Sequence, residues 1–334
     1  MKIPTSSPMR DATEFAHFLG LEPDKVRLRV PYVAGGFGSK IPTKGHFAAL
    51  LLSRRVRRPV RLMPSVEYSF RQNSRHAEVF KAKVGVKTDG TITALDVDLI
   101  VDTGAYTTGG ATAAHNSVIS AWGCYRIPHL RIKGRCVYTN KVPAGHTRAT
   151  GKIQTTWGIE CTMDSVARQL GIDPYEFRRK NVLLRGDFVC KGTPAMDTDY
   201  PDLMAEAIAG IGWDGKANLT PSKNSGARWA RGRGMALSLR HGSQGGGRAY
   251  ALVTLDVRAT VTIQHNAPEI GQGTHNLFSV VAAQTLGVSQ DQIRVRAPDT
   301  AVSLPFAGAS AQRTTMQMGN AVHDACNKLK QELF

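Results

Sequence analysis

Three loops rich in glycine and other small residues are the segments of this sequence best suited to hold a ligand through the main chain. They are "GGFGSK" (35–40), "EIGQGTH" (269–275) and "FAGASAQRTT" (306–315). Glycine lets a ligand approach the backbone closely, and exposed N–H groups attract anions. Taken alone, "GGFG" is more typical of a tight turn between a strand and a helix than of a ligand cradle. Three such loops together favour one shared ligand site.

An internal repeat is expected to position these loops. "FLGLEPDKVRLRV" (18–30) and "TLGVSQDQIRVRA" (285–297) align without gaps at an offset of 267 residues. A helix-like segment precedes each copy, Gly20 and Gly287 stand where that helix would end, and the alternation that follows predicts a strand. Another short strand is expected before each helix. The unit is therefore strand, loop, helix, strand, although duplication could also be architecture alone.

The other segments predict further strands and helices. Residues 76–106 predict a β-meander with an Asp-Gly hairpin turn, and residues 252–266 predict two strands. Residues 159–184 predict two helices divided by Gly171, the second starting at Asp173-Pro174. Glu160 and Asp164 on the first of these helices are expected to serve structure. The polar segment 213–234 predicts a linker.

This order of elements predicts an α+β fold built from duplicated strand–loop–helix–strand units, with mixed sheets and helices on one face, plus the β-meander. We expect a first ligand-binding region at 1–212 and a second, incomplete at its C-terminus, at 235–334. Within the first region the segments of interest are the loop 35–38, the meander 76–106, the loop 143–154 and the helical segment 157–184.

The composition limits the partners and the compartment. The net charge of the 334 residues is +17, from 43 Lys and Arg against 26 Asp and Glu, which suits nucleic acid, an anionic ligand or an acidic partner. The only dense basic run is 53–62 and no aromatic-interleaved platform is present, so nucleic-acid binding is not expected. No membrane span or secretory signal is evident, which predicts a cytoplasmic location. The five cysteines lack a CxxC pair and are expected to be reduced, mostly buried thiols.

Six segments in a fixed order resemble a known family. They are "GGFGSK", "RPVRLM…RHAE", "DGTITALDVDLIVDTGAY", "VYTNKVPAGHTRATGKIQ", "MDSVARQLGIDPYEFRRKNVL" and "EIGQGTHNLFSVVAAQTLGV". Over nearly its whole length the chain resembles the large, molybdopterin-binding subunit of the xanthine dehydrogenase and aldehyde oxidase family of molybdenum hydroxylases.

The resemblance implies a molybdenum ion held by the dithiolene of a molybdopterin, in cytosine dinucleotide or mononucleotide form, and not by protein side chains. Phe37 would pack beside the metal centre, and the Gln272 amide could both donate and accept toward the pterin. A solvated turn is the other interpretation of Gln312 and Arg313. The residues implied to bind the cofactor are Gly35, Gly36, Phe37, Gly38, Gly271, Gln272, Gly273, Ala309, Ser310, Gln312, Arg313 and Thr314.

The resemblance also implies an activity: hydroxylation of an aldehyde or aromatic N-heterocycle with water as the oxygen source. Electrons would leave through partner subunits or domains that carry iron–sulfur clusters and FAD. Arg148 lies where the family places a catalytic arginine near the substrate channel, where it could stabilise developing negative charge. Glu67 falls near the acidic substrate contact of some members, at a different spacing. The alternatives are a subunit of a hydroxybenzoyl-CoA-type aromatic thioester reductase, and a non-catalytic or split-subunit molybdopterin-binding module.

The sequence departs from the family at three places. The glutamate base that the family carries near its C-terminus has no counterpart before the chain ends. Residues 6–8 are Ser-Ser-Pro where the family offers a glutamine toward the metal, and Lys152 and Ile153 replace the usual Gly-x-Pro-Gln context, although Gln154 is kept. We therefore expect part of a longer subunit, completed by the missing C-terminal segment or by a chain that carries it.

Overall fold

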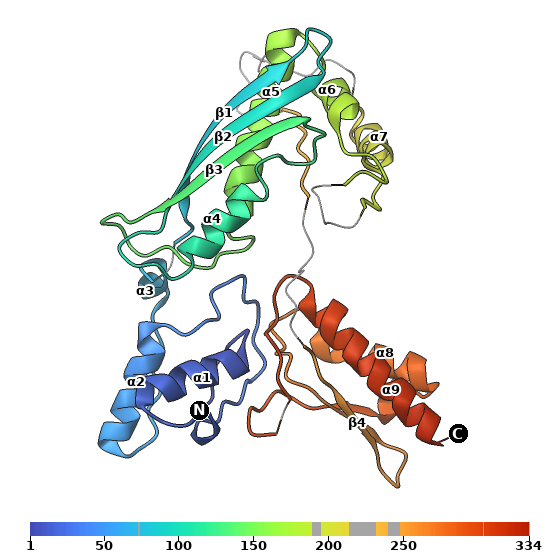
Figure 1. The fold of residues 1–334 in the computed structure, drawn as a ribbon. Helices are drawn as coiled ribbons and strands as arrows, with labels where there is room; N and C mark the ends of the chain where they lie inside the picture. The colour runs from blue at the N-terminus through green and yellow to red at the C-terminus, as the bar shows by residue number, and fades with distance from the viewer. Residues whose placement is uncertain (73, 189–194, 214–231, 240–247, 303, 334) are drawn as a thin grey trace, which may run out of the picture. The chain divides into compact units, whose positions relative to one another are not determined.

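The computed structural model describes residues 1–72, 74–188, 195–213, 232–239, 248–302 and 304–333 (Figure 1). By their contacts the residues form two compact units: unit 1 comprises Met1–Gln72 and His241–Phe334, and unit 2 comprises Asn73–Arg240. Unit 1 is thus built from an N-terminal and a C-terminal segment of the chain, and unit 2 from the segment between them. The division into regions 1–212 and 235–334 stays a prediction, and the predicted linker 213–234 lies mostly outside the described residues.

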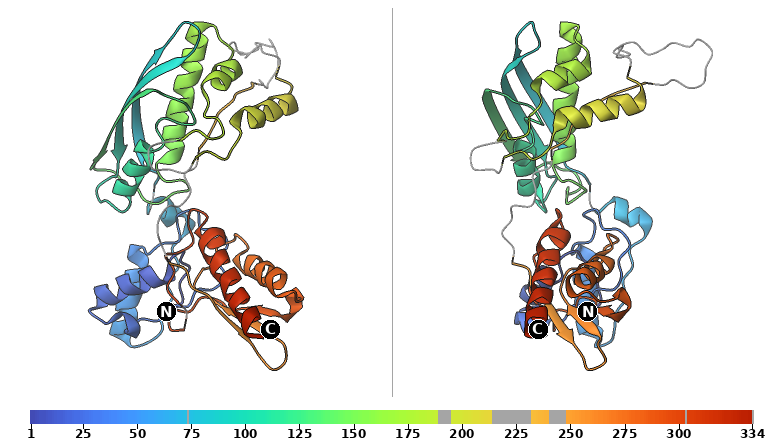
Figure 2. Two further views of the ribbon diagram at one scale, coloured as in Figure 1. Left: turned by 45° about the vertical axis from the view of Figure 1, so that its right-hand side comes forward. Right: turned by 90° about the vertical axis from the view of Figure 1, so that its right-hand side faces the viewer.

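Unit 1 contains both copies of the predicted repeat and one sheet, in the order β4-β5-β6. Helices α8 and α9 pack against each other and against this sheet (Figures 1 and 2). The elements of the unit, in chain order, are α1 (Pro8–Leu19), η1 (Pro23–Lys25), α2 (Lys44–Val56), α3 (Val66–Phe70), β4 (Leu252–Leu255), β5 (Val261–Gln264), α8 (Thr274–Leu286), η2 (Gln290–Gln292), β6 (Ile293–Val295), the π-helical turn η3 (Thr314–Gly319) and α9 (Asn320–Leu333).

The repeat is confirmed in three dimensions. The ends of α1 and α8, and the short helices η1 and η2, are offset by the same 267 residues as the sequences. Gly20 and Gly287 end these helices with φ values of 65° and 73°, the left-handed conformation that favours glycine. The two strands expected in the first copy are not formed. Their segments are connected only by a single parallel β-bridge between Lys2 and Arg29.

Within unit 1 the end of the first copy pairs antiparallel with residues 298–300, which directly follow the second copy. Val30 donates its N–H to the Pro298 carbonyl at 3.2 Å, and Thr300 donates to the Leu28 carbonyl at 3.0 Å. Asp299 forms an ion pair with Arg27 at 2.6 Å across this junction. The duplicated units therefore share one continuous piece of backbone pairing.

Unit 2 is a three-stranded sheet with helices packed on it. The hairpin of β1 (Ala77–Val86) and β2 (Ile92–Asp102) is antiparallel as predicted, but β3 (His129–Val137) runs parallel to β2. The β-meander predicted for residues 76–106 is therefore wrong, because this segment forms only the two-stranded hairpin. The third strand comes later in the chain, after α4 (Gly110–Val118) has carried the chain back to the end of the sheet where β2 began. Leu95, Val97 and Leu99 of β2 pack with Ile159 and Met163 into the core.

The two helices predicted in unit 2 are divided where the sequence indicates, but the first begins at Lys152, before the expected start at 157–159. Helix α5 (Lys152–Leu170) ends at Gly171, whose φ is 68°. Helix α6 (Pro174–Asn181) begins after Asp173, whose carboxylate accepts the N–H groups of Tyr175 and Glu176, and α7 (Tyr200–Ile211) follows. These are the local glycine stop and aspartate cap that the sequence indicates.

Both sheets have the same topology, an antiparallel hairpin followed by a helix and a parallel third strand. The sequence repeat did not predict this shared topology. The repeat relates two segments of unit 1, whereas the shared topology relates β1-β2-α4-β3 of unit 2 to β4-β5-α8-β6 of unit 1. Of the four described cysteines, Cys124 and Cys326 are buried, whereas Cys136 and Cys161 are exposed, so the expectation of mostly buried thiols is only half met. Within the described part of the chain, the helices lack the combination of length and apolar character needed to cross a bilayer.

Candidate functional site

The first loop turns sharply at three of its first four residues. Gly35, Phe37 and Gly38 have φ values of 58°, 47° and 99°, whereas Gly36 keeps an ordinary backbone. Phe37 is not a glycine, so its left-handed conformation is strained, and its side chain is 69% exposed. The Gly36 carbonyl accepts both the N–H and the hydroxyl of Ser39 at 2.8 Å. The loop is held in a defined shape with its aromatic ring outward.

The second loop is organised by the carboxylate of Glu269. Its oxygens accept the N–H groups of Gly271 at 2.8 Å, Gly273 at 3.1 Å and His275 at 3.4 Å, at the start of α8. Partial burial raises the pKa of Glu269, but these backbone hydrogen bonds together outweigh it and hold the pKa below its ordinary value. Glu269 is therefore an ionised carboxylate that shapes this loop.

Gln272 also bonds within the second loop. Its carbonyl oxygen accepts the Ile270 N–H at 2.8 Å, and its amide nitrogen donates to the Pro268 carbonyl at 3.0 Å. In this arrangement the amide faces its own backbone, so a contact between Gln272 and a pterin requires the side chain to turn or to share these bonds. The cofactor-binding role of Gln272 stays a prediction.

The first two loops lie against each other in unit 1. A Cβ built on Gly271, whose φ is 97°, would approach the Gly35 nitrogen to 2.9 Å, and one built on Gly36 would lie 3.4 Å from Cδ1 of Ile270. The Val33 N–H donates to the Glu269 carbonyl at 3.1 Å. Two segments more than 230 residues apart in sequence thus meet through glycine backbone.

The third loop reaches the same region through residues 6–7. Gly308, with φ of 100°, packs so closely on Ser7 that any side chain would collide with it, and Ala309 donates its N–H to the Ser6 carbonyl at 2.8 Å. Ser6 in turn donates its N–H to the carbonyl of Lys40, at the end of the first loop, at 3.0 Å. In the sequence Ser6 and Ser7 stood out only as a departure from the family, yet they connect the first and third loops.

The later residues of the third loop lead into η3 and α9. Ala311 and Gln312 both have positive φ values, 49° and 62°. Arg313 donates to the Ala307 carbonyl at 3.1 Å, which ties the loop to itself, and Thr314 is buried at the start of η3. Ser310 and Gln312 are exposed. Strained residues beside a π-helical turn are frequent at functional sites, which is consistent with the predicted role.

Buried polar side chains at the junction of the first two loops retain hydrogen-bonding capacity. His275, directly after the second loop, bonds through Nδ1 to the hydroxyl of Tyr32, which precedes the first loop, at 3.2 Å. Both polar atoms of the fully buried Asn266, and Nε2 of His265 and of His275, find no hydrogen-bond partner among the described residues. Burial, with a smaller contribution from His275, lowers the pKa of His265 to about 3, so it is neutral.

The two predicted substrate-side residues lie outside this group of loops. Glu67 is on α3 and forms an exposed ion pair with Arg71 at 3.2 Å. Arg148 is an exposed residue of unit 2, in the segment before α5 where Ala149 and Gly151 have φ values of 55° and 81°. Gln154 donates to the His76 carbonyl at 2.7 Å and so stabilises unit 2. The roles of Arg148 and Glu67 stay predictions.

The loops of unit 1 fit a large anionic cofactor bound through the backbone. Glycines line the contact between them, and buried polar atoms adjoin it. Comparison with known proteins agrees. Residues 2–182 match the family model of the molybdopterin cofactor-binding domain, and residues 206–334 match a second model with the same description. The chain belongs to this molybdopterin-binding family, in its xanthine dehydrogenase and aldehyde oxidoreductase branch, as the resemblance predicted.

Individual relatives support this assignment. The chain is similar to a probable xanthine dehydrogenase subunit of Bacillus subtilis, with 31% identity over 95% of this chain and 43% of that protein. It is 28% identical to the aldehyde oxidoreductase of Megalodesulfovibrio gigas, over 93% of this chain and 34% of that protein. The solved structure of aldehyde oxidoreductase from Desulfovibrio gigas superposes with a TM-score of 0.86 at 28% identity, over 98% of this chain and 36% of that chain. The chain thus spans less than half the length of these relatives.

Proposed function

We propose that this chain forms the cofactor-binding part of a molybdenum hydroxylase that oxidises an aldehyde or an aromatic N-heterocycle with water as the oxygen source. The observation that carries the proposal is the meeting of the first two loops, where Gly271 lies against the Gly35 nitrogen. The similarity to a xanthine dehydrogenase subunit and to an aldehyde oxidoreductase supports the class of reaction.

Each loop has a definite task in this proposal. The N–H groups of residues 35–38 and of Ser310 would bind the cofactor, with Gln272 and the Gln312–Thr314 segment as side-chain contacts. Ala309 would lie against the cofactor without donating to it, because its N–H is already bonded to the Ser6 carbonyl. The ionised Glu269 holds the second loop in its binding shape. The exposed Phe37 ring would exclude water from the reaction site. When bound, the cofactor would supply the two-electron redox and Lewis-acid chemistry that these residues lack.

On the substrate side, Arg148 is the residue that we propose to stabilise negative charge developing on a substrate heteroatom. Its guanidinium is permanently charged and lies at the surface of unit 2. Glu67 is the weaker candidate, because a substrate would have to compete with Arg71 for its carboxylate.

We propose that the pterin carries a cytosine dinucleotide or is the mononucleotide, and that iron–sulfur and FAD groups reside on partner subunits or domains. Relatives described as subunits of xanthine dehydrogenases support a multi-subunit assembly. A glutamate base supplied by a partner chain would complete the site. We place the assembly in the cytoplasm.

The test is the molybdenum and pterin content of the purified chain and of Gly36→Val. Gly36 has an ordinary φ, and its Cβ would meet only side-chain atoms at 3.4 Å or more, so the chain should fold with valine there. The valine would nevertheless press on Ile270 and so disturb the junction of the first two loops. We expect the variant to lose most of its molybdenum, measured by elemental analysis, and its oxidised-pterin fluorescence.

Gly210→Val is the matched control, because Gly210 also has an ordinary backbone, lies on α7 and has open space around it. The control should keep the molybdenum content of the unmodified chain. Equal molybdenum in Gly36→Val and in Gly210→Val would contradict binding at the first loop. A chain that contains neither molybdenum nor pterin would show that residues 1–334 do not suffice for binding.

A further inference from the structure

A second surface with a distinctive chemistry lies on α2, α3 and the segment between them. We call residues 51–70 the α2–α3 surface. Nearly every residue in it is exposed, including Met63, Val66 and Phe70, which are 72%, 77% and 82% accessible. Eight large apolar side chains are involved: Leu51, Leu52, Val56, Leu62, Met63, Val66, Tyr68 and Phe70. An apolar group of this size on a soluble unit marks an interaction site.

The same surface is strongly basic. The surface contains five arginines between Arg54 and Arg61 and one acidic residue, Glu67, which forms an ion pair with Arg71. All five are exposed, and none forms an ion pair with a carboxylate of the described residues. Arg54 and Arg55 lie in the last turn of α2, where they also suit the helix dipole, but the other three lie beyond the helix. Their positive charge is left for a partner to balance.

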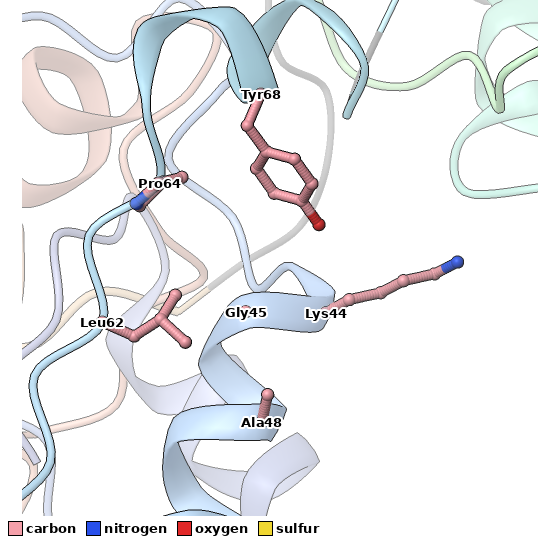
Figure 3. A pocket seen from close by; sticks show the side chains of 6 residues that line it. All are labelled: Lys44, Gly45, Ala48, Leu62, Pro64 and Tyr68. Atoms are coloured by element: carbon pink, nitrogen blue, oxygen red, sulfur yellow. The ribbon is translucent and has the colours of Figure 1, made fainter.

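A pocket of about 320 Å³ opens in this region between α2 and α3 (Figure 3). Ala48, Leu62 and Pro64 form its apolar wall, and Tyr68 projects from α3 toward Gly45 and Lys44. Gly45 allows the 62–64 segment to approach α2, because a Cβ there would lie 3.1 Å from Leu62. The pocket can accept one large apolar side chain.

We propose that the α2–α3 surface binds an acidic protein surface that inserts an apolar side chain into this pocket. Complementary charge steers such partners, and an apolar anchor in a pocket supplies most of the affinity. A second copy of this chain is disfavoured, because each copy carries a charge of +17. The exposed aliphatic residues favour protein over nucleic acid, and the concave pocket favours a discrete side chain over a flat lipid surface.

This proposal does not rest on cofactor binding and is tested separately. Two fluorescent peptides of equal length and equal negative charge are compared with the full chain by anisotropy at physiological ionic strength. In one, Glu alternates with Leu and Phe; in the other, Glu alternates with Gly and Ser. We expect the apolar acidic peptide to bind at least about tenfold more tightly, because only it can fill the pocket.

Charge and apolar variants locate the binding. The double variant Arg55→Glu, Arg58→Glu should lower the affinity for the apolar acidic peptide by about tenfold or more, because two charges that attract the peptide are replaced by two that repel it. Lys328→Glu with Lys330→Glu, at two exposed positions of α9, changes the net charge equally and should have little effect on binding of the apolar peptide. Met63→Ser should weaken binding of the apolar peptide and leave binding of the Gly/Ser peptide unchanged. Circular dichroism is used to check that each variant is folded.

Three results would overturn the proposal. The first is equal affinity for the two peptides, and the second is an equal effect of the two charge reversals, since either would indicate unspecific attraction to a basic protein. The third is tighter binding, through Arg55 and Arg58, to duplex DNA or to phosphatidylserine vesicles than to the apolar peptide. That result would assign the surface to nucleic acid or to lipid.

Discussion

A buried ion pair in unit 2 gives the sharpest prediction about stability. The guanidinium of Arg178 is fully buried and donates to the Glu160 carboxylate at 2.9 Å, and it forms a second ion pair with Asp164 at 2.7 Å. Glu160 also accepts the Tyr125 hydroxyl at 2.8 Å and the Leu237 N–H at 3.0 Å. This network joins α5, α6 and residues 235–239, so Glu160 and Asp164 serve structure as predicted.

Arg178→Met is the perturbation, because methionine keeps the length and apolar stem of the side chain and removes its charge. Glu160, 4% exposed, would be left buried without a cation. Breaking a buried pair in this way costs about 3–5 kcal/mol, a large share of the stability of a typical domain. Arg179→Met is the control on the same helix. Arg179 forms only an exposed ion pair with Glu176, so its loss should cost at most about 1 kcal/mol.

The pH dependence distinguishes a stranded charge from lost packing. Burial raises the pKa of Glu160 more than Arg178 and the hydrogen bonds lower it, and removal of Arg178 would raise the pKa further. A carboxyl group with a higher pKa in the folded than in the unfolded state destabilises the fold above that pKa, and protonation relieves the effect. The loss of unfolding free energy in Arg178→Met should therefore be larger at about pH 8 than at about pH 5.5.

Urea unfolding followed by tryptophan fluorescence is the assay. Trp122, Trp157 and Trp213, the tryptophans among the described residues, all lie in unit 2, so their signal reports on that unit. Equal unfolding free energies for Arg178→Met and Arg179→Met at both pH values would refute this reasoning. A large deficit that does not change with pH would show that lost packing, and not a stranded carboxylate, is the cause.

Two further predictions concern the glycine loops. Gly271→Ala and Gly287→Ala both force alanine to a positive φ, at a cost of about 1 kcal/mol. Only Gly271 also faces the Gly35 backbone. Gly271→Ala should therefore lose more thermal stability than Gly287→Ala, and it alone should lose molybdenum. Equal losses would argue against a tight contact between the loops. Gln272→Ala removes two loop hydrogen bonds and should lower the molybdenum content with a stability loss of about 1 kcal/mol. Unchanged molybdenum would leave Gln272 with a structural role alone.

The local features of this fold were predictable because glycine, proline and aspartate act on their immediate neighbours. Gly20, Gly171 and Gly287 end helices in the left-handed conformation, and Asp173 caps α6. The duplicated unit was visible because both copies keep the same order of helix, glycine and strand. The family resemblance rested on motifs of the same kind, each contained in a short segment.

Long-range pairing escaped prediction, because a strand's sequence does not specify its neighbour. The parallel register of β2 with β3 replaced the expected meander, although the residues between them gave no sign of a crossover helix. The role of Ser6 and Ser7 was missed for the same reason. Their contact with the third loop joins residues some 300 positions apart, and nothing in "PTSSPM" indicates it.

The sequence by itself thus determined the family, the repeat, the helix ends and the three loops that could approach an anionic ligand. Tertiary structure decided which loops touch, through the contact of Gly271 with Gly35 and the bonds from Ser6 to Lys40 and Ala309. It also turned the Gln272 amide toward its own loop and buried Arg178 against Glu160. Backbone conformation depends on adjacent residues, whereas a site depends on distances between segments, and only packing of the whole unit sets those distances.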